Sequence, residues 1–137
     1  MSTLQAFLNS NPVDNLTAEV VVSDRFKDSE GNLLKFKIRA MNSDEFEDCR
    51  KKAMTISGGK RRNVELNLGK LNAAIVINCT LEPNFKDAES IQKLGCTTPE
   101  QYLNKVLLPG EIVELSSQIQ QLSGFKDMDE LVEEAKN

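Results

Sequence analysis

The fold is decided by the stretch LNLGKLNAAIVINC, residues 66–79, which contains an unbroken apolar run at 73–77. Leu68, Leu71 and Ile75 recur at the spacing of one helical face, and the run itself is apolar on every side. A helix of that composition is buried by its neighbours all round. A buried strand is the alternative, because periodicity alone does not distinguish the two over a short run. We favour a central, buried helix.

Two segments before this stretch alternate between apolar and polar residues, as the strands of a half-buried sheet do. The turn sequence DSEGN, residues 28–32, separates them and contains a glycine suited to positive φ. Because a lone hairpin is only marginally stable, we expect helices to cover its apolar face. That face is formed by Ala18, Val20 and Val22 on the first strand and by Leu34, Phe36, Ile38 and Ala40 on the second.

Helical signals occupy most of the remaining chain. A short helix near residues 4–8 should end before the Asn-Pro pair at 11–12, because a residue that precedes proline avoids the helical region. A second helix starts near Asn42 or Ser43, and we expect residues 57–63 to form an exposed loop after it. The apolar face of this second helix is formed by Phe46, Cys49, Ala53 and Ile56.

Capping residues mark further helices in the second half of the chain. The clearest start is at Thr98, which can cap, with Pro99 in the first turn and Gln101 able to complete a capping box. The other starts and stops are Asp87 with Gly95, the Pro109-Gly110 interruption with a helix to Leu122 and Gly124, and a last start at Asp127.

These patterns predict an α+β fold in which an N-terminal β-hairpin packs against a predominantly helical domain. The sequence contains no internal repeat and no low-complexity linker, so we expect residues 1–137 to form a single domain. A chain of 137 residues buries roughly two-thirds of its unfolded surface, which is enough for a core of its own.

Composition argues against an enzyme and against a cofactor. The chain contains no histidine, which is the commonest general base and a frequent metal ligand. Its three cysteines, Cys49, Cys79 and Cys96, lack the close pairing of a structural zinc site. The GGK triplet at 58–60 lacks the spacing of a phosphate-binding loop. We therefore expect no catalytic residue, no metal and no nucleotide.

Charge and hydropathy restrict location and partners. The net charge is −4 and the pI is about 5.0, which argues against nucleic acid as a partner because phosphate backbones repel an acidic chain. No apolar run approaches the ~20 residues of a membrane helix, and the N-terminus lacks the basic and apolar parts of a secretion signal. We expect a cytoplasmic protein that is not secreted and has no membrane partner.

The C-terminal helices are the first candidate surface for a partner. The helix that ends at Leu122 has an apolar repeat with the spacing of a coiled coil, and the last predicted helix adds further apolar residues. Either both helices pack on the domain's own core, or part of their surface receives a partner's apolar segment. In the second interpretation the candidate partner-binding residues are Ile119, Leu122, Met128 and Leu131.

Two basic clusters are the second candidate surface, and together they could form one patch. Such clusters are most simply solvated faces. Otherwise they can dock an acidic protein segment or a nucleic acid. The clusters are Arg50, Lys51 and Lys52, and Lys60, Arg61 and Arg62.

Several strings, in order along nearly the whole chain, resemble the XkdN-like family of phage tail assembly chaperones. The similarity is strongest between residues 82 and 103, and it depends on the length and order of the strings rather than on a catalytic signature. The strings are LQAFL (4–8), FKIRAM (36–41), EPNFKDAES (82–90), LGC (94–96), TPEQYL (98–103) and LLPGEI (107–112), followed by an acidic terminal helix.

The resemblance implies a non-enzymatic assembly factor, made in the cytoplasm of an infected or lysogenic host and absent from the mature virion. It implies that the partner is the tail tape measure protein, which the chaperone keeps soluble while the tail tube polymerises. The tail tube protein, a longer frameshifted form of the chain and further copies of it are additional candidate partners. Two rival functions stay open: a regulatory adaptor of a prophage operon, and a nucleic-acid-binding protein that uses the basic clusters.

The resemblance also generates a prediction about the gene. Tail assembly chaperones of long-tailed phages are often made in two forms, the longer one by a ribosomal frameshift near the end of the short reading frame. The sequence ends Ala135-Lys136-Asn137, which can be encoded as GCA AAA AAC, and this string contains the slippery heptamer A AAA AAC. The simpler alternative is that Lys136 only complements the dipole of a helix end.

If slippage occurs, the gene should have AAA AAC at these codons and an open reading frame in the shifted register. Mass spectrometry of an infected lysate should then find a peptide that spans the junction. Other codons at Lys136 and Asn137, or no such reading frame, would remove the idea.

Overall fold

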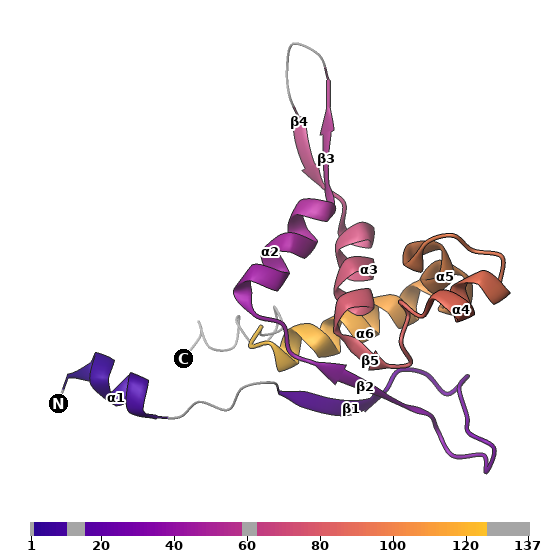
Figure 1. Cartoon of the computed structure of the whole chain (residues 1–137), viewed down its shortest axis with the longest axis horizontal. Coiled ribbons are helices and arrows are strands. Elements are labelled where there is room, and N and C mark those ends of the chain that lie inside the picture. Colours follow the sequence, from indigo (N-terminus) through magenta and orange to yellow (C-terminus); the bar gives the residue numbers. More distant parts are fainter. Residues whose placement is uncertain (1, 11–15, 59–62, 126–137) are drawn as a thin grey trace, which may run out of the picture.

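A three-stranded antiparallel sheet lies beneath a group of helices in the computed structural model, which describes residues 2–10, 16–58 and 63–125 (Figure 1). The order of the elements confirms an α+β fold with an N-terminal hairpin and a mostly helical remainder. In chain order the elements are α1 (Thr3–Asn9), β1 (Thr17–Val21), β2 (Lys35–Arg39), α2 (Ser43–Lys52), β3 (Met54–Ser57), β4 (Asn63–Leu66), α3 (Leu68–Cys79), β5 (Thr80–Glu82), α4 (Ala88–Lys93), α5 (Pro99–Val106) and α6 (Pro109–Leu122).

The predicted hairpin is the antiparallel pair β1–β2, whose register places Ala18 opposite Ile38 and Val20 opposite Phe36. Phe36 and Ile38 are both buried, so the face predicted from the alternation is the one that enters the core. The third strand, β5, pairs with the other edge of β2. The sequence does not predict β5, because three residues are too few to show an alternation.

α3 is the central buried helix that residues 66–79 predict. Asn67 accepts a hydrogen bond from the N–H of Lys70 at 3.0 Å, and this side-chain cap defines the start of the helix. The helices α2, α5 and α6 pack around it, as Figure 1 shows. Its buried residues are Leu71, Ala73, Ala74, Ile75, Val76, Ile77 and Cys79.

α6 contacts both α3 and the strands β1 and β2, so it joins the helical layer to the sheet. The buried Ser116 donates from Oγ to Asn72 Oδ1 of α3 at 2.8 Å and accepts from Gln120 Nε2 at 3.0 Å. These bonds matter because a buried polar atom without a partner costs about 1–3 kcal/mol. The apolar residues of α6 that complete the core are Ile112, Leu115 and Ile119.

The helix predicted after residue 42 ends earlier than its apolar stripe indicates, because α2 stops at Lys52. Ile56, predicted on the same helical face, lies instead in β3 and is 69% exposed. The predicted loop at 57–63 is wrong at its two ends, since β3 and β4 pair there as a two-stranded sheet, and residues 59–62 lie outside the described part. β-branched residues around Ile56 favour a strand over a helix.

The other helix starts predicted within the described part of the chain are confirmed, with one correction. The predicted capping box at Thr98 is wrong, because the side-chain oxygen of Gln101 accepts from the N–H of Thr97, at 2.9 Å, one residue earlier. The side-chain caps are Asn42 on α2, Asp87 on α4 and Thr98 on α5, and the left-handed stops are Gly95 and Gly124.

The structure describes the N-terminal helix but not the last residues, 126–137. α1 is capped by Ser2, and none of its residues is buried. The helix predicted from Asp127 lies outside the described residues. Within the described part of the chain, no helix is long and apolar enough to cross a membrane.

The burial of α3 gives a direct stability prediction. Ile75 is 0% exposed at the centre of the core, so Ile75→Ala should lower the free energy of unfolding by about 2–5 kcal/mol, measured by urea denaturation. The control is Val113→Ala, whose side chain is 55% exposed and whose effect should stay within about 0.5 kcal/mol. A small effect of Ile75→Ala would contradict the central position of α3.

Candidate binding groove

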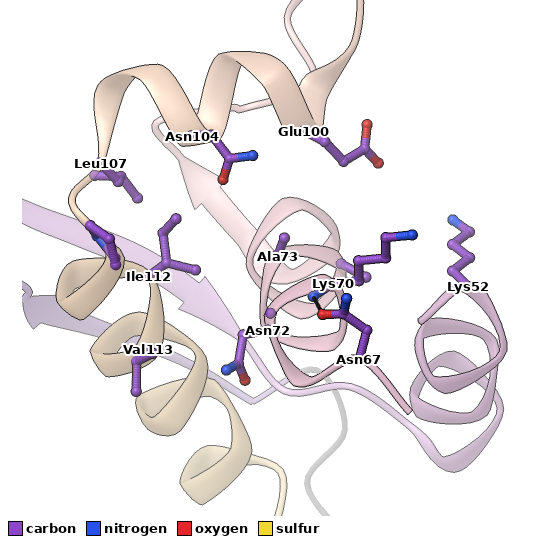
Figure 2. A pocket seen from close by; sticks show the side chains of 13 residues that line it. Lys52, Asn67, Lys70, Asn72, Ala73, Glu100, Asn104, Leu107, Ile112 and Val113 are labelled. Atoms are coloured by element: carbon purple, nitrogen blue, oxygen red, sulfur yellow. Dashed lines mark hydrogen bonds between the residues drawn. The ribbon is translucent and has the colours of Figure 1, made fainter. Parts of the chain in front are cut away.

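A groove with a volume of about 760 Å³ lies between α3, α5 and α6 (Figure 2). Its size is within the ~300–1,000 Å³ of typical ligand pockets. α3 supplies the floor, α5 and α6 supply one side, and Lys52 reaches it from the end of α2.

The floor of the groove is apolar. Ala73 and Ala74 of α3 lie beside Leu107 and Ile112, and all four residues are less than a tenth exposed. The two alanines create the hollow because a methyl group fills far less space than the side chains around it. Val113 lies at the edge and is 55% exposed, so it offers apolar surface directly to a ligand.

The rim of the groove is polar and unevenly charged. In Figure 2 the charged side chains of Lys52, Lys70 and Glu100 lie toward one end, and the apolar side chains of Ile112 and Val113 lie toward the other. Lys52 and Lys70 form no ion pair with another described residue. A ligand with an apolar stripe and an acidic end would therefore match both ends of the groove.

The chemistry of the lining suits binding. Its polar groups, besides the charged side chains, are amides, which can each donate and accept a hydrogen bond. Asn104 projects from α5 into the groove in Figure 2. No group of three His, Cys, Asp or Glu side chains that could hold a metal occurs among the described residues.

An ion pair holds the α6 side of the groove in place. The carboxylate of Glu111 accepts from Arg25 Nε at 2.8 Å and Nη2 at 2.7 Å, and from the N–H of Leu108 at 2.7 Å. Arg25 lies between β1 and β2, so the pair ties the first turn of α6 to the hairpin. Hydrogen bonding by the Arg25 guanidinium lowers the pKa of Glu111 from 4.5 to about 2.

The structure places the predicted partner-binding residues at different depths. Ile119 is 0% exposed and belongs to the core, so the domain's own packing accounts for it. Leu122 is half-buried against the same core. Met128 and Leu131 lie outside the described residues, and their part in binding stays a prediction.

The two basic clusters are only partly described. Arg50 forms an ion pair with Glu47 at 2.9 Å on the surface of α2, whereas Lys51 and Lys52 are exposed. The second cluster, Lys60, Arg61 and Arg62, lies outside the described residues, so a joint patch stays a prediction.

The groove is a functional feature that the sequence analysis missed. Its floor combines residues from 73–74 with residues from 107–113, and no local pattern indicates that these segments meet. The available signal is the pair Ala73-Ala74 inside a run of larger apolar residues, where small side chains leave space on a buried helix.

Fold and groove together define a small α+β protein with a partly apolar groove on its surface. A model of the phage XkdN-like tail assembly chaperone proteins matches residues 4–136, so the chain belongs to this family. Two similar proteins come from Bacillus subtilis strain 168. The uncharacterized protein YqbN is 29% identical, and the alignment covers 98% of this chain and 93% of YqbN. The protein XkdN of the phage-like element PBSX is 25% identical with the same coverage.

A solved structure supports the fold. The crystal structure of the protein YqbN superimposes with a TM-score of 0.72 at 26% identity, covering 92% of this chain and 99% of that one. The expected family is thus confirmed by sequence, and the architecture described above is similar to one determined by crystallography.

The ion pair at the groove gives a prediction about acid stability. Because the pKa of Glu111 is lower in the folded chain, the pair stabilises the fold above about pH 4.5, and this contribution is lost as the pH falls toward about 2. Glu111→Gln should lower stability at neutral pH by on the order of 1 kcal/mol, allowing for the exposed side of Arg25. The free energy of unfolding of this variant should also change less than that of the parent between about pH 4.5 and about pH 2.

The measurement is urea denaturation at a series of pH values. Glu114→Gln, on the exposed side of α6, is the matched control and should keep the parent's profile. If both variants show the same profile as the parent, the pair does not hold α6 in place.

Proposed function

We propose that this chain binds the tail tape measure protein and keeps it soluble during assembly of the tail tube, without itself acting as an enzyme. It works in the cytoplasm of the host or lysogen and leaves before the virion matures. The groove between α3, α5 and α6 is the observation that carries the proposal, because it offers an uncovered apolar surface beside a charged rim.

The shape of the groove supports a helical ligand. An amphipathic helix presents an apolar stripe about one side chain wide, and it can place successive side chains of that stripe over the buried alanines. A volume of about 760 Å³ accommodates a few side chains rather than a whole helix about 10 Å across. We therefore infer that each copy contacts a short part of the client.

Short contacts suit a chaperone that must later be removed. A long helical client exposes many apolar stripes, and exposed stripes aggregate. Many copies, each bound weakly along one client, protect it through multivalency, and each copy can still be displaced as the tube grows. The tail tube protein, a longer form of this chain and neighbouring copies remain candidate partners in this process.

Substitutions at the edge of the groove test the proposal. Val113→Glu together with Asn104→Glu places two carboxylates beside the apolar floor, and both positions are exposed, so the fold should survive. When this variant is co-expressed with the tape measure protein of the same phage, most of the client should move from the soluble fraction to the pellet. The parent chain should keep it soluble.

The control is Val21→Glu, which puts the same charge on an exposed valine of β1 outside the groove. Circular dichroism must show equal thermal midpoints for the three chains. If the groove variant protects as well as the parent, the binding surface lies elsewhere, and Leu122, Met128 and Leu131 become the next positions to test. If the parent gives no protection, the proposed function is wrong.

A further inference from the structure

The N-terminal helix α1 presents an apolar stripe that is largely uncovered. Leu4, Phe7 and Leu8 have the spacing of one helical face, and their side chains are 65%, 64% and 64% exposed. None of residues 3–9 is charged, so only hydroxyls and amides accompany the stripe. Covering such a face with another apolar surface is favourable, because apolar area is then removed from water.

Hydrogen bonds define both ends of α1. The N–H of Gln5 donates to Ser2 Oγ at 3.1 Å, and Ser10 Oγ donates to the carbonyl of Phe7 at 2.6 Å. Helices shorter than about 12–15 residues are nevertheless marginal in water, and α1 has 7 residues. Packing of the stripe against another surface would therefore stabilise the helix itself.

The groove between α3, α5 and α6 is complementary to this stripe. Its floor is apolar at Ala73 and Ala74, and Val113 at its edge is 55% exposed. Its volume of about 760 Å³ accommodates a few side chains, and α1 presents three large ones. The amide of Asn104, which projects into the groove in Figure 2, can bond with the amide of Gln5 beside the stripe. Each chain thus contains one exposed apolar helix and one open apolar groove.

The place where α1 joins the body favours the groove of a second copy. The N–H of Ala40 donates to the carbonyl of Leu16 at 2.8 Å, and the N–H of Met41 donates to Ser123 Oγ at 3.0 Å. The connection to α1 therefore leaves the body beside the C-terminal end of α6. The first turns of α6 line the groove instead, and roughly 15 Å of helix separates Val113 from Ser123.

The connection is short for a path to the chain's own groove. Even when fully extended, the six residue steps from Ser10 to Leu16 span at most about 22 Å. That path runs for roughly 15 Å along α6 and also passes around a helix about 10 Å across, which uses nearly all of this reach. Figure 1 shows α1 at one end of the molecule and α5 toward the other. A second copy imposes no such limit.

We propose that α1 of one copy docks in the groove of a second copy, with Leu4, Phe7 and Leu8 over the alanine floor. The contact is heterologous, because a helix meets a groove, so a dimer keeps one free helix and one free groove and can add further copies. Three side chains bury less area than the roughly 1,200–2,000 Å² of a stable interface, so association should require a high protein concentration. The inference does not depend on the proposed function, because it concerns copies of this chain alone.

Sedimentation velocity of the full chain tests the contact. The mean sedimentation coefficient of the parent should rise between low micromolar and near-millimolar concentration. Phe7→Glu places a charge in the stripe and should keep the chain monomeric over the whole range. Ala6→Glu is the matched control, because it places the same charge on the opposite side of α1, and it should associate like the parent.

A mixture of two variants identifies the two surfaces. The groove variant, Val113→Glu with Asn104→Glu, keeps its helix but has a charged groove, whereas Phe7→Glu keeps its groove but has a charged helix. Each alone should be monomeric. An equimolar mixture should form a one-to-one dimer that grows no further, because only one helix–groove contact is then possible. Val21→Glu, on an exposed valine of β1, is the control for the groove variant and should associate like the parent.

All substituted side chains are exposed, and circular dichroism should show the parent's thermal midpoint for each variant. A parent that stays monomeric at every concentration would overturn the proposal. Association of Phe7→Glu alone, or of the groove variant alone, would overturn it as well, and so would a mixture that stays monomeric. None of these results decides whether the chain keeps a client soluble on co-expression, so this inference and the proposed function fail separately.

Discussion

The burial of α3 on nearly all of its sides is the constraint on which the rest of the structure depends. A helix with apolar residues in every direction has no face for water, so α2, α5 and α6 must surround it. Its few polar side chains then need partners inside the fold. Asn72 is bonded by Ser116 of α6, and Asn78 donates to the sulfur of Cys49 on α2 at 3.3 Å. The covering helices are thus positioned by hydrogen bonds as well as by apolar packing.

The same constraint explains why a groove exists. Where α3 presents Ala73 and Ala74, its neighbours α5 and α6 cannot close over the helix without leaving space. Arg25 and Glu111 hold α6 at its first turn, so it does not move in to fill that space. The buried position of α3 and the groove above it therefore both depend on the short apolar run at residues 73–77.

Local patterns in the sequence predict a large part of this fold. Alternation identifies β1 and β2, capping residues identify α2, α4 and α5, and apolar composition identifies α3, because each signal lies within the element that it describes. The features that escape prediction depend on contacts between distant segments. β5 is a strand only because β2 has a free edge beside Thr80. Ile56 has the spacing of a helical face. The helix nevertheless ends before Ala53, and Ile56 lies in β3, where it pairs with Val64.

The candidate site divides in the same way. Leu122 and Ile119 are correctly read as apolar positions on α6, but only the packing shows that Ile119 is enclosed by this chain's own core. The groove is missed because the two parts of its floor, residues 73–74 and 107–113, are separated by more than thirty residues of sequence. The family, by contrast, is recognised from the sequence, because a resemblance compares whole strings and needs no knowledge of which residues meet.

The junction between α3 and β5 has a mechanical consequence. Thr80 is both the C-cap of α3, through its N–H bond to the carbonyl of Val76, and the first residue of the strand, opposite Ile38. No loop separates the two elements, so α3 cannot slide or rotate unless the sheet changes register. Because α3 is fixed in this way, the floor of the groove is a preorganised surface. It loses little conformational freedom when a ligand binds. If a chain binds there as proposed, the entropy of ordering falls on that chain, so segments that are already partly helical in solution should bind more tightly than equally apolar segments that are not.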